Sequence, residues 1–185
     1  MGAVFARNGA DYLAVADLTE GIRLRQRGIT TPILVYPNSL PAAAADALAH
    51  GLVPTLVDLD AARAYSQAAA GPCEVFVKID VGLERLGVPA EQAVKTILAM
   101  LELRHLRVGG LCAHPHAEAG ADPAYADWQL RRFTGVVDEL EARGVAVPVR
   151  LLAATPWVLR FPHTYLNAVD PGRMLYGITF PGETP

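Results

Sequence analysis

Short apolar runs alternate with amphipathic or alanine-rich stretches along the chain. Continuous apolar runs of about four to eight residues are typical of strands buried on both faces, as in a parallel sheet covered by helices. Helices are expected where apolar residues recur at intervals of three and four. The pattern therefore predicts a strand-then-helix unit repeated about seven times.

The strands and helices can be placed by residue number. Strands are predicted at residues 12–15, 33–36, 52–57, 74–79, 108–113 and 147–152, and a seventh is expected within residues 168–176. Helices are predicted at residues 18–26, after Pro41, and at 60–70, 89–102, 123–143 and 156–160, with a helix-like stretch at 2–8 ahead of the first strand. Gly28 is expected to cap the first of these helices, since glycine suits the left-handed conformation at helix ends.

Two architectures fit this alternation, a doubly wound sheet and a barrel. No GxGxxG turn follows an early strand, which disfavours the dinucleotide-binding form of the doubly wound sheet. A closed barrel has eight strands and typically ~250 residues, whereas this chain offers seven predicted strands in 185 residues. We therefore expect an α/β fold, a (β/α)8 TIM-type barrel that lacks the first strand.

Composition and charge exclude several classes of protein. Hydrophobic residues make up 52% and charged residues 19% of the chain, which excludes disorder and a coiled coil. The net charge is −3 and no basic patch is clustered, so a nucleic-acid partner is not expected. Two cysteines do not make a disulfide framework. No apolar run approaches the ~20 residues of a membrane span, and no signal peptide opens the chain, so we expect a cytoplasmic protein without membrane contact.

Polar residues at the ends of the predicted strands are the candidates for chemistry, because barrel active sites lie at the carboxyl ends of the strands. Lys78 is near the end of the fourth strand and Arg85 follows in KIDVGLERLG. A lysine on a buried strand is costly unless it is paired, so Lys78 can be a structural ion-pair partner. The functional alternative is a contact from Arg85 to a cofactor or carboxylate, because a guanidinium suits anionic oxygens.

His114 and His116 follow the fifth strand in LCAHPHAEAG. Two histidines at this spacing can bind a metal, but no CxxC, HExxH or third histidine accompanies them, so no metal is expected. The favoured functional interpretation is a single histidine that faces a ligand.

Two further groups surround the last predicted strands. Thr155 is interpreted as a helix N-cap ahead of Pro156, with a phosphate seat as the functional alternative. Asp170, Gly172 and Arg173 follow within the last run, where Gly172 would let backbone approach a ligand closely. Barrels often hold a phosphate near their seventh and eighth strands, so these residues are candidates for a phosphate cup.

Five segments in order carry a family resemblance: GADYLAVADLTEGIRLRQRGITTPILV, VKIDVGLERLG, GLCAHPHA, LLAATPWVLRFP and VDPGRMLYG. Together they resemble the N-terminal barrel of the alanine racemases, over about residues 2 to 177. The resemblance implies a barrel followed by a β-rich domain, a homodimer, and isomerase chemistry that makes the D-amino acid of a cell-wall precursor. It also implies a barrel domain over residues 1–180, with 181–185 starting a linker.

The alanine racemases use pyridoxal phosphate (PLP), which the resemblance implies here as well. In the family, a lysine on the first strand holds PLP covalently, and a tyrosine from the partner's β-domain faces it. Lys78 matches a structural lysine that is carbamylated in many members. Arg85 matches the arginine that interacts with that carbamate near the ring hydroxyl, and His114 matches the histidine beside the ring. Thr155 matches a serine that helps to hold the phosphate, while Gly172 and Arg173 match positions where backbone amides meet it.

The chain also departs from the family pattern. It begins where the lysine motif would end and stops shortly after the barrel, so it looks truncated at both ends. Lys78 and Lys95 are its only lysines, and neither matches the PLP lysine. We therefore expect the 185-residue chain alone to be inactive.

Two site positions differ as well, since Ala154 replaces an asparagine and Asp170 replaces an arginine that faces the pyridine nitrogen. An aspartate there would favour the protonated ring and a stronger electron sink, so a complete enzyme carrying it would not act as a plain alanine racemase.

Two other functions stay open. The first is a non-catalytic, degenerate barrel that binds a small phosphorylated ligand or a partner chain, which the changes at Ala154 and Asp170 favour. The second is a one-domain regulatory barrel that binds PLP, which ranks below the others because it also needs a first-strand lysine.

Overall fold

The computed structural model describes residues 1–37, 40–116 and 122–180 of the chain. The chain divides into two compact units, of which the first holds Met1–Lys78 with Lys95–Val108, and the second holds Ile79–Val94 with Gly109–Pro185. Neighbouring strands pair in the order β1-β2-β3-β4-β6-β7-β8, with β5 beside β4, and the registers resolved along this order are parallel. Parallel strands in chain order with helices between them make an α/β fold of TIM-barrel type, as predicted.

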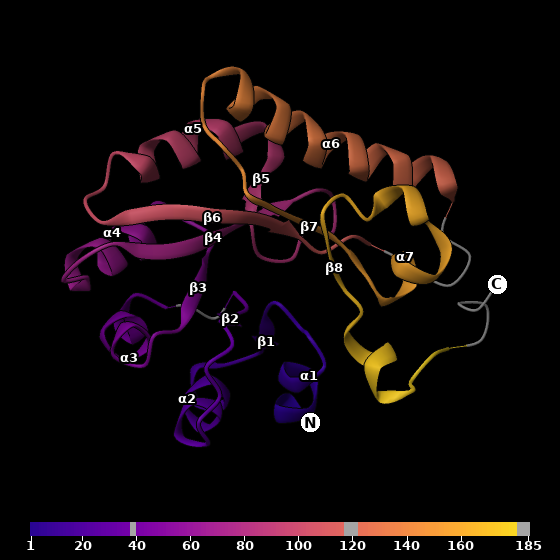
Figure 1. The fold of residues 1–185 in the computed structure, drawn as a ribbon. Helices are drawn as coiled ribbons and strands as arrows, with labels where there is room; N and C mark the ends of the chain where they lie inside the picture. Colours follow the sequence, from indigo (N-terminus) through magenta and orange to yellow (C-terminus); the bar gives the residue numbers. More distant parts are fainter. Residues whose placement is uncertain (38–39, 117–121, 181–185) are drawn as a thin grey trace. The chain divides into compact units, whose positions relative to one another are not determined.

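The first unit begins with one helix and then alternates strands and helices (Figure 1). Its elements are α1 (Gly2–Arg7), β1 (Leu13–Val15), α2 (Leu18–Gln26), β2 (Ile33–Val35), η1 (Pro41–Ala43), α3 (Ala44–Ala49), β3 (Val53–Leu56) and α4 (Leu59–Ala68). Three elements contribute residues to both units: β4 (Cys73–Asp80), α5 (Ala90–Leu101) and β6 (Leu106–Ala113).

Helices of the first unit begin and end on specific polar contacts. The carboxylates of Asp17 and Asp58 accept the backbone N–H groups of Glu20 and Ala61, at 2.9 and 2.7 Å, and so cap α2 and α4. Near the end of α2, the Arg25 guanidinium donates to four backbone carbonyls in the turns that follow α2 and α3, those of Ile29, Thr31, His50 and Gly51. Desolvation by burial lowers the pKa of Arg25. Arg25 thus holds two successive turns together through their backbones.

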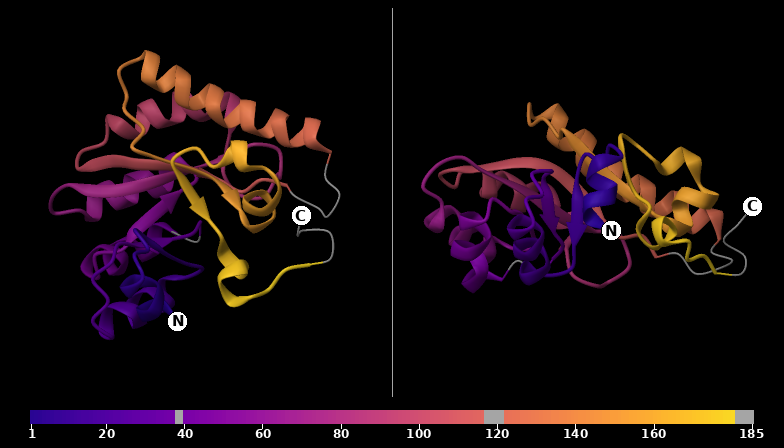
Figure 2. Two further views of the ribbon diagram at one scale, coloured as in Figure 1. Left: turned by 45° about the vertical axis from the view of Figure 1, so that its right-hand side comes forward. Right: turned by 60° about the horizontal axis from the view of Figure 1, so that its bottom comes forward.

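The second unit contains the remaining strands and the longest helix. Its further elements are β5 (Val88–Pro89), α6 (Pro123–Ala142), β7 (Val149–Ala154), α7 (Thr155–Arg160), η2 (Pro162–Thr164), β8 (Ala168–Asp170) and η3 (Gly172–Tyr176). Strand β7 pairs with β6 on one side and with β8 on the other. Helix α7 lies beside β8 in each view of the fold (Figure 2).

Helix α6 buries one face along its whole length. The buried positions recur at helical spacing: Ala126, Gln129, Phe133, Val136, Val137 and Leu140. Residues three and four apart share a helix face, so this spacing makes a continuous stripe. Gln129 is the polar member of that stripe, with 0% of its surface exposed.

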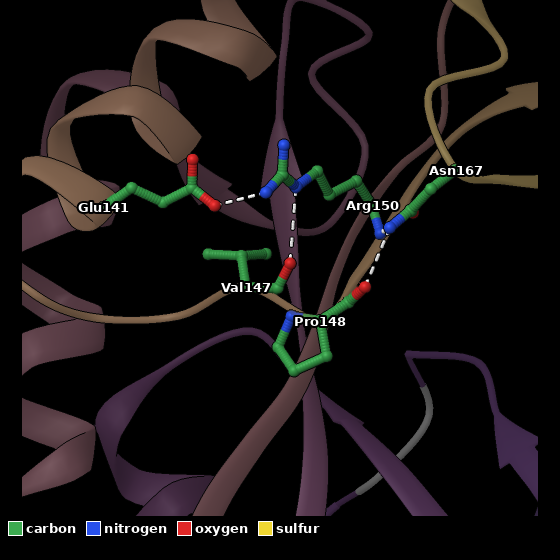
Figure 3. A network of polar contacts seen from close by, with 5 residues as sticks. All are labelled: Glu141, Val147, Pro148, Arg150 and Asn167. Atoms are coloured by element: carbon green, nitrogen blue, oxygen red, sulfur yellow. Dashed lines mark hydrogen bonds and ion pairs between the residues drawn. The ribbon is translucent and has the colours of Figure 1, made fainter.

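Polar side chains also bracket the amino ends of β7 and β8 (Figure 3). The Asn167 amide accepts the backbone N–H of Arg150 and donates to the carbonyl of Pro148, both at 2.8 Å. The Arg150 guanidinium reaches Glu141 near the end of α6 and the carbonyl of Val147 at 3.3 Å. The starts of both strands are therefore tied to each other and to the end of α6.

Two predicted element ends can be compared with the structure. Gly28 follows the C-cap residue Arg27 with a φ of +78°, and the N–H groups of Gly28 and Ile29 donate to the carbonyls of Arg25 and Leu24, so the glycine ends α2 as predicted. Within residues 168–176, the strand covers Ala168–Asp170. Pro171 lacks a backbone N–H, and Gly172 has a φ of +48° and opens η3, so the extended conformation ends there. Strand β5 was not predicted.

Among the described residues, no helix is both long and apolar enough to cross a bilayer.

Candidate functional site

Four of the predicted site residues come together in the second unit, where β7 and β8 end. Ala154 and Asp170 are paired in register, so the residues that follow each strand are neighbours. We call Thr155, Asp170, Gly172 and Arg173 the strand-end cluster. It lies at the carboxyl ends of parallel strands, where barrels place their active sites.

Thr155 does not cap the helix as predicted. The N-cap of α7 is Ala154, and Thr155 is already the first helical residue. Its side chain is 3% exposed, and its hydroxyl donates to the carbonyl of Pro171 in a short contact. The tertiary contact across the two strand ends has replaced the local cap, because β8 brings an acceptor within reach.

Gly172 faces Thr155 closely. Its φ of +48° lies in the left-handed region, and a Cβ built on it would lie 3.5 Å from Thr155 Oγ1 and 3.8 Å from Asp170 Oδ1. A side chain at this position would therefore fill the space beside the hydroxyl. A close approach of a ligand to this backbone stays a prediction.

Asp170 turns its carboxylate back onto this backbone. Its Oδ1 accepts the N–H of Gly172 at 3.1 Å. An anion that used the same N–H would meet a negative carboxylate beside it, and like charges at such distances repel. Asp170 is thus the member of the cluster that opposes an anionic ligand.

Arg173 supplies the positive charge of the cluster. The centre of its guanidinium lies 4.3 Å from the ring centroid of Phe180. Its backbone carbonyl accepts the N–H of Ile178 at 3.2 Å, which folds the chain back after η3. A guanidinium over an aromatic face is stabilised by the ring.

Arg85 and His114 follow two other strands of the same unit, β4 and β6, and both side chains are exposed. In the loop that carries Arg85, the Asp80 carboxylate accepts the N–H groups of Gly82 and Glu84, at 2.9 and 3.1 Å. Their place after strand ends agrees with the prediction, and they lie on loops separate from the strand-end cluster.

Lys78 belongs to the first unit and lies within β4. Its side chain is buried, with 5% of the residue exposed. A charged amine in such a place needs partners, so a structural role for this lysine stays a prediction.

Two residues that sequence reasoning missed hold these loops. Tyr125 and Gln129 of α6 hydrogen-bond to the segments around Gly82 and His116. The signal was present in the sequence as a glutamine within the apolar stripe of α6.

Within the described part of the chain, no group of three or more His, Cys, Asp or Glu side chains is placed to hold a metal ion.

Comparison with known proteins places the chain in a family. The family model described as "Alanine racemase, N-terminal domain" matches residues 2–180. An alanine racemase of Methanococcus maripaludis is 33% identical over 180 residues, and one of Desulforamulus reducens is 35% identical over 179 residues. Each alignment covers 95% of this chain and 48% of the relative, so the chain spans about half the length of these relatives.

A solved alanine racemase of Clostridium difficile, in complex with cycloserine, has the same fold. The TM-score is 0.93 at 29% identity, and the match covers 99% of this chain and 51% of that chain.

Proposed function

The chain belongs to the alanine racemase N-terminal domain family, and we propose that it forms the cofactor-binding barrel of a PLP-dependent amino-acid racemase that acts on alanine. The observation that carries the proposal is the strand-end cluster, where the buried Thr155 hydroxyl lies beside the backbone of Gly172 at the carboxyl ends of β7 and β8. This donor set suits a phosphate group.

The residues present fit most of PLP. The Thr155 hydroxyl and the backbone N–H groups at Gly172 and Arg173 would hold the phosphate. Arg85 and His114, on the loops after β4 and β6, would face the ring. When bound, PLP supplies an electron sink that makes the α-proton of an amino acid more acidic.

Two contacts within the cluster compete with a phosphate. The Thr155 hydroxyl donates its proton to the carbonyl of Pro171, so it must turn to donate to a phosphate. The Asp170 carboxylate already accepts the N–H of Gly172, so a phosphate there must compete with it. We expect Asp170→Asn, which keeps the shape and removes the charge, to tighten PLP binding by about five- to tenfold, as relief of about 1 kcal/mol of repulsion would. Equilibrium dialysis of wild type and variant against PLP measures this, with Asp11→Asn as the control. Equal affinities would contradict the role assigned to Asp170.

Asp170 should also change the protonation of the pyridine nitrogen of PLP. If it approaches the pyridine nitrogen, the ring should stay protonated to a higher pH than in an Asp170→Arg variant. Absorbance titration of the two PLP complexes compares the ring protonation directly. Identical titrations would remove this part of the proposal.

The 185-residue chain by itself should not racemise alanine. Its two lysines are Lys78, buried in β4, and Lys95, on α5, and neither matches the lysine that holds PLP in the family. Without a lysine and a base on opposite faces of the substrate, no proton exchange at the α-carbon is supported. Incubation with L-alanine and PLP, followed by chiral chromatography, should give no D-alanine, and measurable turnover would falsify this expectation.

A direct test of PLP binding uses two ligands. The strand-end cluster should bind PLP at least about tenfold more tightly than pyridoxal, because only PLP carries the charged phosphate that the cluster would hold. Equal affinity for both ligands, or binding of neither, would contradict the proposed site. We further propose that the complete enzyme is a cytoplasmic homodimer whose product serves cell-wall synthesis, as the family resemblance implies.

A second function is favoured by one observation. Because Ala154 and Asp170 stand where the family resemblance implies an asparagine and an arginine at the PLP site, the barrel can be a non-catalytic one that binds a small phosphorylated ligand other than PLP. Competition separates the two functions. Inorganic phosphate and sugar phosphates would displace PLP readily from a general phosphate site, but only weakly from a site that also holds the PLP ring.

A further inference from the structure

Two polar side chains near the start of α6 reach two different loops of the second unit. Tyr125 and Gln129 are four residues apart, so they share one face of the helix. One contacts the loop after β4 and the other the segment after β6. These are the loops that carry Arg85 and His114.

Tyr125 fixes the loop after β4 at Gly82. Its hydroxyl donates to the carbonyl of Gly82 at 3.0 Å, and its ring stacks on Trp128 with 5.3 Å between centroids and 16° between planes. Gly82 has a φ of +128°, and a Cβ there would lie 2.6 Å from Trp128 Cζ3. Only glycine fits against this pair of rings, so the loop contacts α6 closely at Gly82.

Trp128 also contacts a charged side chain of α6. The Arg132 guanidinium lies 4.6 Å from the Trp128 ring centroid and pairs with Glu91 at 2.5 Å. The Arg132–Glu91 pair therefore stabilises the Tyr125–Trp128 stack that contacts Gly82.

Gln129 fixes the segment after β6 at His116. Its Oε1 accepts the backbone N–H of His116 at 2.7 Å, and its Nε2 donates to the carbonyl of the same residue at 3.2 Å. The side chain is fully buried, so an apolar residue would fill this position of the stripe at a lower desolvation cost. The amide instead binds both polar groups of one backbone residue, which sets the segment in a single register.

We propose that Tyr125 and Gln129 are positioning residues, which hold the Arg85 and His114 loops in the geometry that binds PLP. The inference rests on the proposed function for the roles of Arg85 and His114. Tyr125 acts three residues before Arg85, and Gln129 acts two residues after His114. Neither needs to touch PLP itself.

The test compares four single variants of the full chain. Tyr125→Phe removes one hydroxyl, and Gln129→Glu removes the amide donor while it keeps an acceptor. Tyr12→Phe is the control for the first, since Tyr12 donates to Glu74 in the first unit. Asn167→Asp is the control for the second, because Asn167 also bridges a backbone N–H and a backbone carbonyl, at the opposite ends of the strands.

Three quantities are measured well below the melting temperature: PLP affinity, amide hydrogen exchange at residues 83–87 and 114, and Tm. Tyr125→Phe and Gln129→Glu should each weaken PLP binding by about three- to tenfold, the range expected from one lost hydrogen bond. Exchange should rise at residues 83–87 in the first variant and at residue 114 in the second. Neither control should change PLP affinity or exchange at these amides.

The outcomes separate the inference from the proposed function. A lower Tm with unchanged PLP affinity and unchanged exchange would overturn the positioning role, because it describes a purely structural contact. A wild-type chain that binds no PLP contradicts the proposed function, and the exchange data then decide the inference. Faster exchange confined to the named loops supports it, and unchanged exchange overturns it.

Discussion

The two ends of the β7–β8 pair use polar groups in opposite ways. At the amino end, the Asn167 amide and the Arg150 guanidinium bind backbone and a carboxylate, and every contact described for them joins parts of the protein to each other. At the carboxyl end, Asp170 and Thr155 surround a glycine whose missing side chain leaves space beside the hydroxyl. Both arrangements join the two strand ends, but only at the second does a glycine lie beside the contacting side chains.

Helix α6 connects with both arrangements within the same unit. Its last turns supply Glu141 to the amino end of the strand pair, and its first turns supply Tyr125 and Gln129 to the loops after β4 and β6. The comparison teaches that stability and binding are separable along this helix, as they are between the two faces of a TIM-type barrel. Three variants test that separation, from the largest expected effect to the smallest.

Gly172→Val should reduce PLP affinity by about tenfold or more with little change in the fold. The valine side chain would lie beside Thr155 Oγ1, because a Cβ at this position would be 3.5 Å from that oxygen. A β-branched residue also resists a φ of +48°. Equilibrium dialysis and thermal melting give the two effects separately. Gly177→Val is the matched control, because Gly177 has a φ of +73° but nothing within 4 Å of its Cβ position. If both variants lose affinity equally, backbone strain and not the cluster is responsible.

Asn167→Ala should lower stability and leave PLP affinity unchanged. It removes two hydrogen bonds to backbone at an exposed site, a loss of about 1 kcal/mol in the free energy of unfolding. For a chain of this size the corresponding fall in Tm is about 2–4 °C. Ser66→Ala, which removes one hydroxyl that donates to the carbonyl of Arg104 in the first unit, is a milder control. A change in PLP affinity would break the separation between the two strand ends.

Glu91→Gln should have the smallest effect, confined to neutral and mildly acidic pH. The hydrogen bond from Arg132 lowers the pKa of Glu91 below its ordinary value of 4.5. A carboxyl with a lowered folded-state pKa stabilises the protein above that ordinary value, and the contribution is lost as the pH falls through the folded-state pKa. Because the Glu91 side chain is 64% exposed, solvent screens the pair, and the expected difference in Tm is about 1 °C.

Melting curves across the acid range, for wild type and Glu91→Gln, decide this last point. The two proteins should differ at pH 6 to 7, about two pH units above the ordinary carboxyl pKa, and converge at acid pH. If the difference in Tm between the two proteins grows toward acid pH, the Glu91–Arg132 ion pair is not its cause.

Local pattern was a good guide wherever burial alone decides the structure. The run ILVY predicts a buried strand, and β2 is buried at each of its three residues. The prediction of residues 18–26 as a helix agrees with α2 in full, because Asp17 caps its start and apolar residues recur at helical spacing. The last strand was expected within residues 168–176 and covers Ala168–Asp170, while Leu175 and Tyr176 are exposed members of η3.

The local sequence pattern did not predict contacts between segments that are far apart in the chain. Thr155 has every local feature of an N-cap, yet its hydroxyl donates to Pro171, sixteen residues later. Gln129 could be recognised as unusual in an apolar stripe, but its partner His116 could not. Both depend on how neighbouring strands and helices come together, which no local pattern encodes.

The sequence by itself determined the alternation of strands and helices, the barrel type of the fold, the family, and the residues that end each strand. These follow from the spacing of apolar residues and from motifs that are contiguous in the chain. The tertiary structure decided which of those residues meet. In the folded chain the Asp170 carboxylate accepts the Gly172 N–H, and α6 hydrogen-bonds to the loops after β4 and β6. These contacts depend on packing, because hydrogen bonds form between groups that packing brings within about 3 Å.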